Sequence, residues 1–459
     1  MAPRITIIGG GSYQWAPKLL VDLANTRALH EAEVVLHDID PAPLPPMVEL
    51  AGHIAAIRGI PLTARATTDR REALEGADYV VVTISTGGFA SMRHDLDVPA
   101  RYGVRQSVGD TVGPGGVARA LRNIPVMLGI ARDVEEQCPD AWLLNLTNPM
   151  TTICRALTRE TRVKTIGLCH EVTITHFLLS LLLDVSFLEL RPTVAGVNHL
   201  PFITALDAAG DDGFARLRAL LDDPAVGEQP LAMDPPDDIG YEKVSPGEHW
   251  TKADLLHNNR VKLELFARFG VLPGAGDRHL AEFFPGFLTE ESGWGTRWGV
   301  PLTSIAERER DQRAYVAGFA ELLRAGDVPA MPSGEMVAPV IRCIERDEPG
   351  WFPLNIPNTN QVVDLPTEVA VESICTVDAG GVRGRDHVQL PAPVAEVLRR
   401  VSSSQELTVE AAVTGDRDTV FAAMLLDPLA GRIDYDHLAR MTDEVLAATS
   451  EWLPQFAPA

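Results

Sequence analysis

The chain has 459 residues, of which 46% are hydrophobic and 22% are charged, the balance of a globular protein. That length exceeds what one hydrophobic core usually supports, so two domains are expected. The formal net charge of -23 argues against nucleic acid or an anionic membrane as a partner, because both carry negative charge. An acidic chain can still bind an acidic small molecule if a local group of cationic side chains receives it.

The first residues, MAPRITIIGG, enter a strand pattern at once and lack the basic and apolar regions of a secretory signal. No apolar run approaches the length of a membrane span. The five cysteines are odd in number and show no paired spacing, which is typical of a reducing compartment. We therefore expect a cytoplasmic protein.

The N-terminal pattern is that of a dinucleotide-binding unit. Residues 5–13 predict a buried strand ending in a glycine turn, and a helical spacing and a second strand at 33–40 follow. Such a turn lets phosphates approach the backbone, and an acidic residue after the second strand can bind a ribose. The usual third glycine is replaced by Gln14, so a glycine-rich turn in another doubly wound fold is the alternative. The predicted NAD contacts here are Gly9, Gly10, Gly11, Ser12 and Asp38.

The alternation of strands and helices continues to about residue 195. Apolar strands are expected at 77–85, 141–149 and 163–170, which predicts a doubly wound parallel α/β sheet. Ligands gather at the carboxyl ends of such strands. The further cofactor contacts predicted there are Thr86, Gly87 and Asn145. Between these strands, Gly113–Gly116 reads as a loop, and the helix after it is expected to be disturbed at Pro125.

Two apolar runs, VKTIGLCH and LELRPTVAGVNH, end in a cysteine and a histidine. Both runs are typical of strands, so Cys169 and His199 would be delivered to one crevice and could form half of a metal site. The alternative is a buried cysteine that acts as a small hydrophobe and a core histidine with satisfied hydrogen bonds.

Beyond residue 195 the strand–helix alternation breaks down, which suggests domains at 1–195 and 196–459. Residues 207–238 are rich in Asp, Pro, Ala and Gly and are expected to form a surface excursion or lid. Helices are expected at 303–325, at 333–347 and from about 391 onward. Short strands with turns are expected between those last two helical regions.

Several ordered blocks carry a resemblance to a known family: ITIIGGGS, LHDID, DTVGPGGVARALRNIPV, LNLTNPM, GLCHEV, GVNHL, GAGDRHLAEFFP and NIPNTNQVVDLP. The chain resembles the NAD- and manganese-dependent glycosidases of glycoside hydrolase family 4 over essentially its full length. The resemblance implies an N-terminal Rossmann-like domain and a C-terminal mixed α/β domain, similar to lactate and malate dehydrogenases. It also implies that the second domain completes the active site and an oligomer interface, in a homodimer or homotetramer.

The resemblance assigns roles to particular residues. Cys169 and His199 become ligands of Mn²⁺, although thiolate on such a hard cation is an uncommon pairing. His170 becomes the candidate general acid, with orientation of a neighbour as its alternative. Tyr241 becomes the candidate base, against an ordinary surface tyrosine. Asn148 would bind sugar hydroxyls near C2 and C3, against a local turn.

The implied reaction differs from hydrolysis by paired carboxylates, for which no pair stands out in this sequence. Hydride leaves C3 of the sugar for NAD, and the base then removes the acidified proton on C2. The substituent on C1 is eliminated, water adds, and the hydride returns to C3. NAD is therefore a catalytic cofactor that is not consumed.

The four residues from Cys169 read CHEV and resemble the α-galacturonidase subgroup, so Glu171 marks the predicted substrate. Arg278 is the predicted partner of the sugar carboxylate, because arginine can hold a carboxylate through two parallel bonds. Arg93 and Lys243 are weaker candidates. An α-glucuronidase or an α-galactosidase of the same family is the alternative. Outside the family, the alternatives are an NAD-dependent hydroxy-acid dehydrogenase and a non-catalytic dinucleotide sensor.

Overall fold

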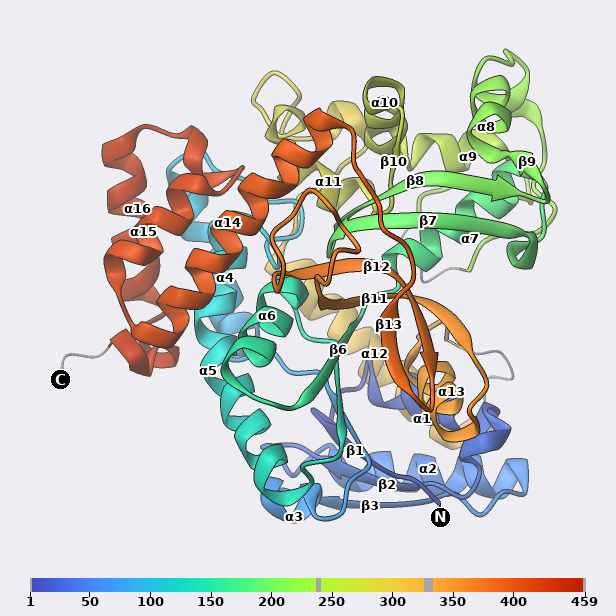
Figure 1. Ribbon diagram of the computed structural model, residues 1–459, viewed down its shortest axis with the longest axis vertical. Helices are drawn as coiled ribbons and strands as arrows, with labels where there is room; N and C mark the ends of the chain where they lie inside the picture. Colours follow the sequence, from blue (N-terminus) through green and yellow to red (C-terminus); the bar gives the residue numbers. More distant parts are fainter. Residues whose placement is uncertain (1, 237–240, 326–332, 457–459) are drawn as a thin grey trace.

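The computed structural model describes residues 2–236, 241–325 and 333–456. Within these ranges a single 13-stranded sheet runs through the molecule in the order β10-β8-β7-β12-β11-β6-β5-β4-β1-β2-β3, with β13 beside β12 and β9 beside β8. Figure 1 shows this sheet rising from β3 at the bottom to β8 at the top, with helices on both sides.

The N-terminal half of the sheet has the Rossmann strand order. Its six strands are all parallel and lie in the order β3-β2-β1-β4-β5-β6. The predicted doubly wound parallel sheet is therefore confirmed. The strands are β1 (Arg4–Ile8), β2 (Glu33–His37), β3 (Thr63–Thr67), β4 (Tyr79–Val82), β5 (Trp142–Asn145) and β6 (Lys164–Leu168).

Helices cover both faces of this sheet, which is why its inner strands read as nearly continuous apolar runs, whereas the edge strand β3 does not. In β4, Val80 and Val82 belong to one hydrophobic core, whereas Tyr79 and Val81 belong to the other. Because successive side chains point to opposite faces of the sheet, one strand contributes to the hydrophobic cores on both faces. The helices of the first core include α5 (Gly113–Gln137), α6 (Met150–Glu160) and α14 (Ala392–Thr414), and those of the second include α1 (Ala16–Asn25), α2 (Leu44–Arg58) and α13 (Val337–Arg346).

The prediction of a loop at Gly113–Gly116 is wrong, because these residues form the first turn of α5. Proline is tolerated in a first helical turn, where its missing N–H has no partner to lose. Glycine is required at Gly116, since a Cβ atom there would lie 2.4 Å from the backbone carbon of Thr111. The helix then continues through Pro125 to Gln137.

The second half of the sheet adds antiparallel strands to β6, so the predicted mixed α/β region is confirmed. β11 (Gly350–Pro357) pairs with β6, and β12 (Ala370–Asp378) lies between β11 and β7 (Leu190–Val197). The other strands are β8 (Leu200–Ala208), β9 (Asp211–Asp212), β10 (Leu272–Pro273) and β13 (Gly381–Gly384). β7 crosses the predicted domain boundary at 195, and that division stays a prediction.

Residues 207–236, the described part of the expected surface excursion or lid, contain regular secondary structure. They include the end of β8, β9 and the helix α8 (Gly213–Leu221). Asp212 starts α8 by accepting hydrogen bonds from the N–H groups of Phe214 and Ala215, a favourable N-cap. The expected surface excursion therefore includes a short helix, and residues 237–240 lie outside the described part of the chain.

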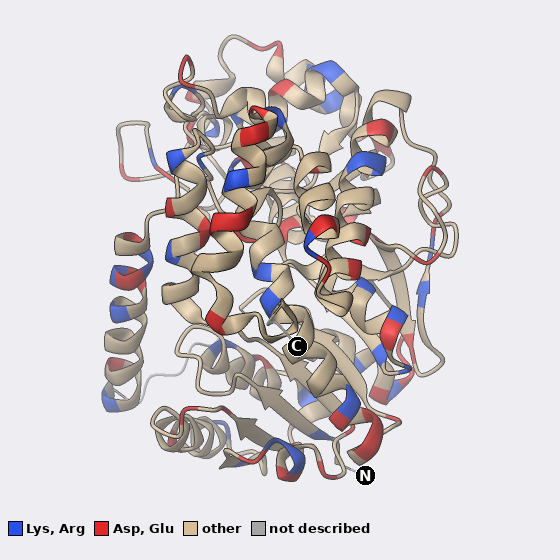
Figure 2. Cartoon of the chain, turned by 90° about the vertical axis from the view of Figure 1, so that its left-hand side faces the viewer, with Lys and Arg blue, Asp and Glu red and all other residues tan. Residues whose placement is uncertain are grey.

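The helices predicted for the second half are confirmed. Figure 2 shows acidic and basic residues interspersed along the helices that face the viewer. Among the described residues, no helix combines the length and apolar character needed to cross a membrane. The remaining α-helices are α3 (Arg70–Leu74), α4 (Gly88–Arg101), α7 (Glu171–Leu183), α9 (Lys252–His257), α10 (Arg260–Phe269), α11 (Asp277–Phe283), α12 (Ile305–Ala325), α15 (Arg417–Leu426) and α16 (Tyr435–Ala448).

Candidate active site

The glycine turn after β1 is fastened to the end of β2. The N–H groups of Gly9 and Gly10 donate to the His37 carbonyl oxygen at 2.9 and 2.8 Å. Gly9 has φ +89°, and a Cβ atom there would lie 2.0 Å from the Thr83 oxygen, so only glycine fits. The N–H of Gly11 donates to Oδ2 of Asp38 at 3.0 Å. The turn therefore forms a backbone cradle at the carboxyl edge of the sheet, and its geometry fits a dinucleotide.

The beginning of α1 lies beside this cradle. The N–H of Trp15 donates to the Ser12 hydroxyl oxygen at 3.2 Å. The indole of Trp15 lies 6.5 Å from the His170 ring, measured between centroids. The cofactor residues predicted after β1 thus lie near a residue predicted to act on the substrate.

A second loop, after β4, is held by a fully buried ion pair. Arg122 on α5 donates through Nη1 to Asp95 on α4 at 2.9 Å and through Nε to the Thr86 carbonyl oxygen at 3.0 Å. Both charged side chains are completely buried. Gly87 follows in the left-handed conformation, with φ +76°, and starts α4. This pair therefore fixes the loop that contains two of the predicted cofactor contacts.

The side chain of Asn145, at the end of β5, forms its hydrogen bonds within the turn that follows the strand. Its amide oxygen accepts from the N–H of Thr147 at 3.0 Å, and its amide nitrogen donates to the carbonyl oxygen of the same residue at 3.1 Å. The structure thus shows Asn145 shaping the turn that leads to Asn148. A direct contact from Asn145 to the cofactor stays a prediction.

Cys169 and His170 lie between the end of β6 and the start of α7, as the strand pattern predicts. Burial and the nearby charges of Glu372 and Glu171 raise the pKa of the Cys169 thiol well above its usual value. The His170 Nδ1 atom lies 2.9 Å from Oε1 of Glu335. Burial alone would lower the pKa of His170, but the hydrogen bond and charge of Glu335 outweigh it and raise that pKa.

His199 occupies the tight turn between β7 and β8 and has φ +63°, a left-handed conformation that histidine tolerates better than most residues. Its Nδ1 atom lies 2.8 Å from the Thr111 hydroxyl, which donates its only proton to Oδ1 of Asp110 at 2.7 Å. Nδ1 must therefore carry the proton, which leaves the lone pair on Nε2 for a metal. Burial and the His279 charge lower the pKa of His199 to about 3, so the ring is neutral near pH 7.

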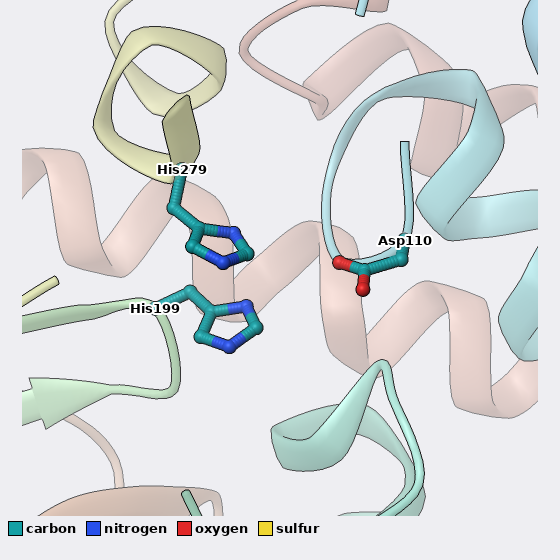
Figure 3. A group of neighbouring side chains, drawn as sticks. All are labelled: Asp110, His199 and His279. Atoms are coloured by element: carbon teal, nitrogen blue, oxygen red, sulfur yellow. The ribbon is translucent and has the colours of Figure 1, made fainter. Parts of the chain in front are cut away.

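Asp110 from the loop before α5, His199 from the turn after β7 and His279 from α11 lie beside one another (Figure 3). Their possible donor atoms lie within 4.8 Å of one another, and they are the one such group found in the described ranges. The two imidazole rings are stacked with centroids 3.6 Å apart. Two histidines and a carboxylate form a common donor set for divalent transition metals. The residues present therefore fit a metal such as Mn²⁺, but Cys169 is not a member of this group, so its ligand role stays a prediction.

Glu171 faces the histidine cluster. Its Oε2 accepts from the N–H of Gly276 at 2.6 Å, and its Oε1 lies 3.9 Å from Nε2 of His279. Burial would raise the pKa of this carboxyl, but His279, His199 and His170 outweigh that effect and hold it at about 2. Glu171 is thus an anion that positions His279, and its predicted contact with the substrate is untested.

Unpartnered polar atoms surround this cluster. The Asn148 amide nitrogen donates to Oδ2 of Asp110 at 3.2 Å, while its amide oxygen is buried without a partner among the described residues. Asn198 Oδ1 and His279 Nδ1 are also buried and unpartnered there. Buried polar groups without partners are uncommon in folded proteins, and a bound polar ligand would satisfy them.

The other predicted substrate residues have protein partners. Arg278 donates to the Ser107 carbonyl oxygen at 3.0 and 2.6 Å and to the Thr303 hydroxyl at 2.8 Å. Arg93 is 52% exposed and forms an ion pair with Glu309 at 3.2 Å. The structure therefore brings neither guanidinium to the histidine cluster as a free group.

Tyr241 donates its hydroxyl to Asn259 Oδ1 at 3.2 Å. Burial raises its pKa, and the negative charges of Glu171 and Asp277 raise it further. Lys243, a weaker candidate for the sugar carboxylate, donates to the Gly247 carbonyl oxygen at 2.9 Å. The role of Tyr241 as base stays a prediction.

The sequence reasoning missed Asp110, Thr111, His279 and Glu335. Asp110 and Thr111 lie in the DTVGPGG block and His279 in the GDRH block. Polar residues inside blocks shared with a family were a usable signal for these three. Glu335 lies in no such block, and only the fold reveals its contact with His170.

The buried carboxyl group of Glu282 leads to a prediction about how the stability of the protein depends on pH. Oε1 of Glu282 accepts from the N–H groups of Val108 and Gly109 at 2.8 and 2.9 Å, and its Oε2 is buried without a partner in the described structure. Burial raises the pKa of Glu282 to about 8 from an ordinary 4.5. The folded state therefore keeps a proton that the unfolded chain releases, and stability should fall as pH rises from about 5 to 8.

We expect Glu282→Gln to unfold with a shallower pH dependence than the wild type over that window. The measurement is the free energy of unfolding in urea at pH 5, 6.5 and 8. Glu248→Gln, at an exposed position, is the control and should follow the wild type. Parallel curves for Glu282→Gln and the wild type would contradict the prediction.

Comparisons with known proteins identify the family of the chain. Models of the family 4 glycosyl hydrolases match residues 4–185, and the C-terminal domain of that family matches residues 194–430. The chain is 33% identical to an α-galacturonidase of Thermoanaerobacterium saccharolyticum over 98% of this chain and 96% of that protein. It is 31% identical to an α-galactosidase of Bacillus subtilis, with 99% of each chain covered.

Two solved structures are similar over nearly the whole chain. The crystal structure of lplD from Bacillus subtilis has a TM-score of 0.85 and 30% identity, covering 97% of this chain and 99% of that one. A 6-phospho-α-glucosidase from gut microorganisms, in complex with NAD and Mn²⁺, has a TM-score of 0.79 and 22% identity over all of both chains, which shows a shared fold. The chain belongs to family 4 of the glycosyl hydrolases.

Proposed function

We propose that this glycoside hydrolase is an α-galacturonidase that requires NAD and Mn²⁺. The observation that carries the proposal is the cluster of Asp110, His199 and His279. Asn148 joins this cluster to the carboxyl end of β5, the sheet edge at which the glycine cradle follows β1. The CHEV sequence at 169–172 and the α-galacturonidase relative favour the uronide. An α-galactosidase is the second candidate, because a relative of nearly equal identity has that activity. An α-glucuronidase would differ only in the configuration at C4.

NAD, when bound, supplies an acceptor and donor of hydride at C3 of the sugar. Mn²⁺, when bound, supplies Lewis-acid stabilisation of negative charge next to the reacting carbons. The protein residues bind and position the metal and the substrate. His199 would provide the lone pair on Nε2 to the metal, and Asn148 would provide its amide oxygen to a sugar hydroxyl. His170, held by Glu335, donates a proton to the leaving group. Tyr241 is the proposed base for the proton on C2, a role that requires a bound cation to lower its raised pKa.

The test is a set of nitrophenyl α-glycosides and α-uronides assayed with NAD, Mn²⁺ and a reductant. We expect the α-galacturonide to release nitrophenol fastest, and only when both cofactors are present. Faster release from the α-galactoside would replace the proposed substrate with the second candidate. Accumulation of one NADH per substrate would instead identify a dehydrogenase.

The five cysteines are all free thiols, which supports the proposed cytoplasmic location. A homodimer or homotetramer stays the expected assembly, to be measured by light scattering.

A further inference from the structure

A uronide substrate needs a cation, and the arginines near the site differ in what they already bind. Arg278 is held by Ser107 and Thr303, and Arg93 by Glu309. Arg119 on α5 donates through Nε to the Asn148 carbonyl oxygen at 3.1 Å. None of these three guanidinium groups is without a protein partner.

Arg308 lies in the first turn of α12 and differs from these three arginines in its contacts. It is half-buried, yet no side-chain hydrogen bond or ion pair of Arg308 occurs among the described residues. Its acidic neighbours in sequence have other partners: Glu307 lies 3.8 Å from Arg310, and Glu309 pairs with Arg93. A half-buried guanidinium that no protein group engages keeps its N–H donors available to an anionic ligand.

The start of α12 is fastened to the loop that carries Asp110. The Thr303 hydroxyl donates to the Ser107 carbonyl oxygen at 2.8 Å, and the Thr303 N–H donates to the Gln106 carbonyl oxygen at 3.2 Å. At the other side, the ion pair between Arg93 and Glu309 joins α4 to α12. Arg308 therefore lies between two contacts that join the start of α12 to the Asp110 loop and to α4.

The charges around Arg308 support a binding site for an anion. Burial lowers the pKa of both Arg119 and Arg278, and the positive charge of Arg308 lowers each of them further. Arg308 therefore lies near enough to Arg119 and Arg278 for their positive charges to interact, opposed in part by Asp110 and Glu307. In a chain of net charge -23, such a local group of cations is the feature that an acidic substrate requires.

We propose that Arg308 is the specificity-determining residue that binds the carboxylate of the sugar. The proposal rests on the proposed uronide substrate and assigns its recognition to α12, which lies along the left edge of the molecule in Figure 2. Arginine can bind a carboxylate through two parallel hydrogen bonds. Arg278, the arginine predicted from the sequence, has the structural role of joining the Asp110 loop to Thr303.

The experiment measures kcat and KM of Arg308→Met on nitrophenyl α-galacturonide and nitrophenyl α-galactoside. Methionine retains the apolar stem and removes the charge. A hydrogen bond to a charged group contributes about 1.5–3 kcal/mol, so kcat/KM for the galacturonide should fall roughly 10- to 100-fold. We expect the loss mainly in KM, with the galactoside affected less than about 3-fold. Arg308→Lys should be intermediate, because it keeps the charge without the paired bonds.

Arg310→Met is the matched control, because Arg310 lies two residues away on the same helix and is 63% exposed. It should leave both substrates unchanged, and melting temperatures show whether each variant is folded. If the wild type prefers the galacturonide and Arg308→Met keeps that preference, the role of Arg308 is wrong and the substrate stands. If the wild type prefers the galactoside, the proposed substrate and the assignment of Arg308 both fall.

Discussion

Replacing His199 with alanine is expected to lower kcat/KM about 1,000-fold or more and to abolish tight Mn²⁺ binding. Thr111 fixes the proton of His199 on Nδ1, so the lone pair on Nε2 is available to a metal. Metal stabilisation of a reacting oxygen contributes several kcal/mol, and each 1.36 kcal/mol changes the rate tenfold. The measurements are steady-state kinetics and the electron paramagnetic resonance signal of free Mn²⁺ during titration.

His176→Ala is the control, because His176 stacks on Phe187, with ring centroids 4.0 Å apart, and belongs to no donor cluster of the described residues. This variant should be less stable than the wild type, because it loses the packing against Phe187, but its affinity for Mn²⁺ should be unchanged. Two further variants identify the remaining ligands. If Cys169→Ser binds Mn²⁺ as the wild type does while His279→Ala binds it weakly, the ligand pair taken from the family is wrong for this chain.

Asp95→Ala is expected to lose about 3–5 kcal/mol of unfolding free energy, because it leaves the Arg122 guanidinium buried without its counter-charge. The expected result is a lower urea midpoint together with weaker NAD binding, since Arg122 also holds the Thr86 carbonyl oxygen. Denaturant unfolding and fluorescence titration with NAD measure the two effects.

The double variant Asp95→Leu with Arg122→Met tests whether the uncompensated charge of Arg122 causes the loss of stability. Removing both charges should restore a large part of the lost stability, because no buried charge is left uncompensated. An Asp95→Ala variant that unfolds at the wild-type midpoint would show that the pair contributes little. Arg310→Met, which removes an exposed charge, should remain within about 0.5 kcal/mol of the wild type.

The sequence was sufficient for the features that depend on local periodicity. Apolar runs bounded by glycine predicted the Rossmann strands, and the ends of two of these runs correctly placed Cys169 and His199 after β6 and β7. Such inferences succeed because strands buried on both faces must be apolar throughout, and because side chains at the carboxyl edge must be polar to bind a ligand.

The features that depend on distant contacts could not be predicted in this way. Gly113–Gly116 has the composition of a loop, but close packing of α5 against Thr111 requires glycine inside the helix. Arg278 and Arg308 are both arginines near polar sequence, and only the fold shows which guanidinium is already bound. The pairing of His170 with Glu335 joins residues 165 positions apart, which no local pattern encodes.

The continuity of the sheet also bears on how the chain is made. β6 is complete at Leu168, but the strand that covers its open edge, β11, begins only at Gly350. At about 5–20 residues per second, the ribosome leaves that edge exposed for roughly ten to forty seconds. An uncovered strand edge is a template for pairing with another chain. Nascent chains released before β11 should therefore aggregate through β6, and this interval is where a chaperone would have its greatest effect on yield.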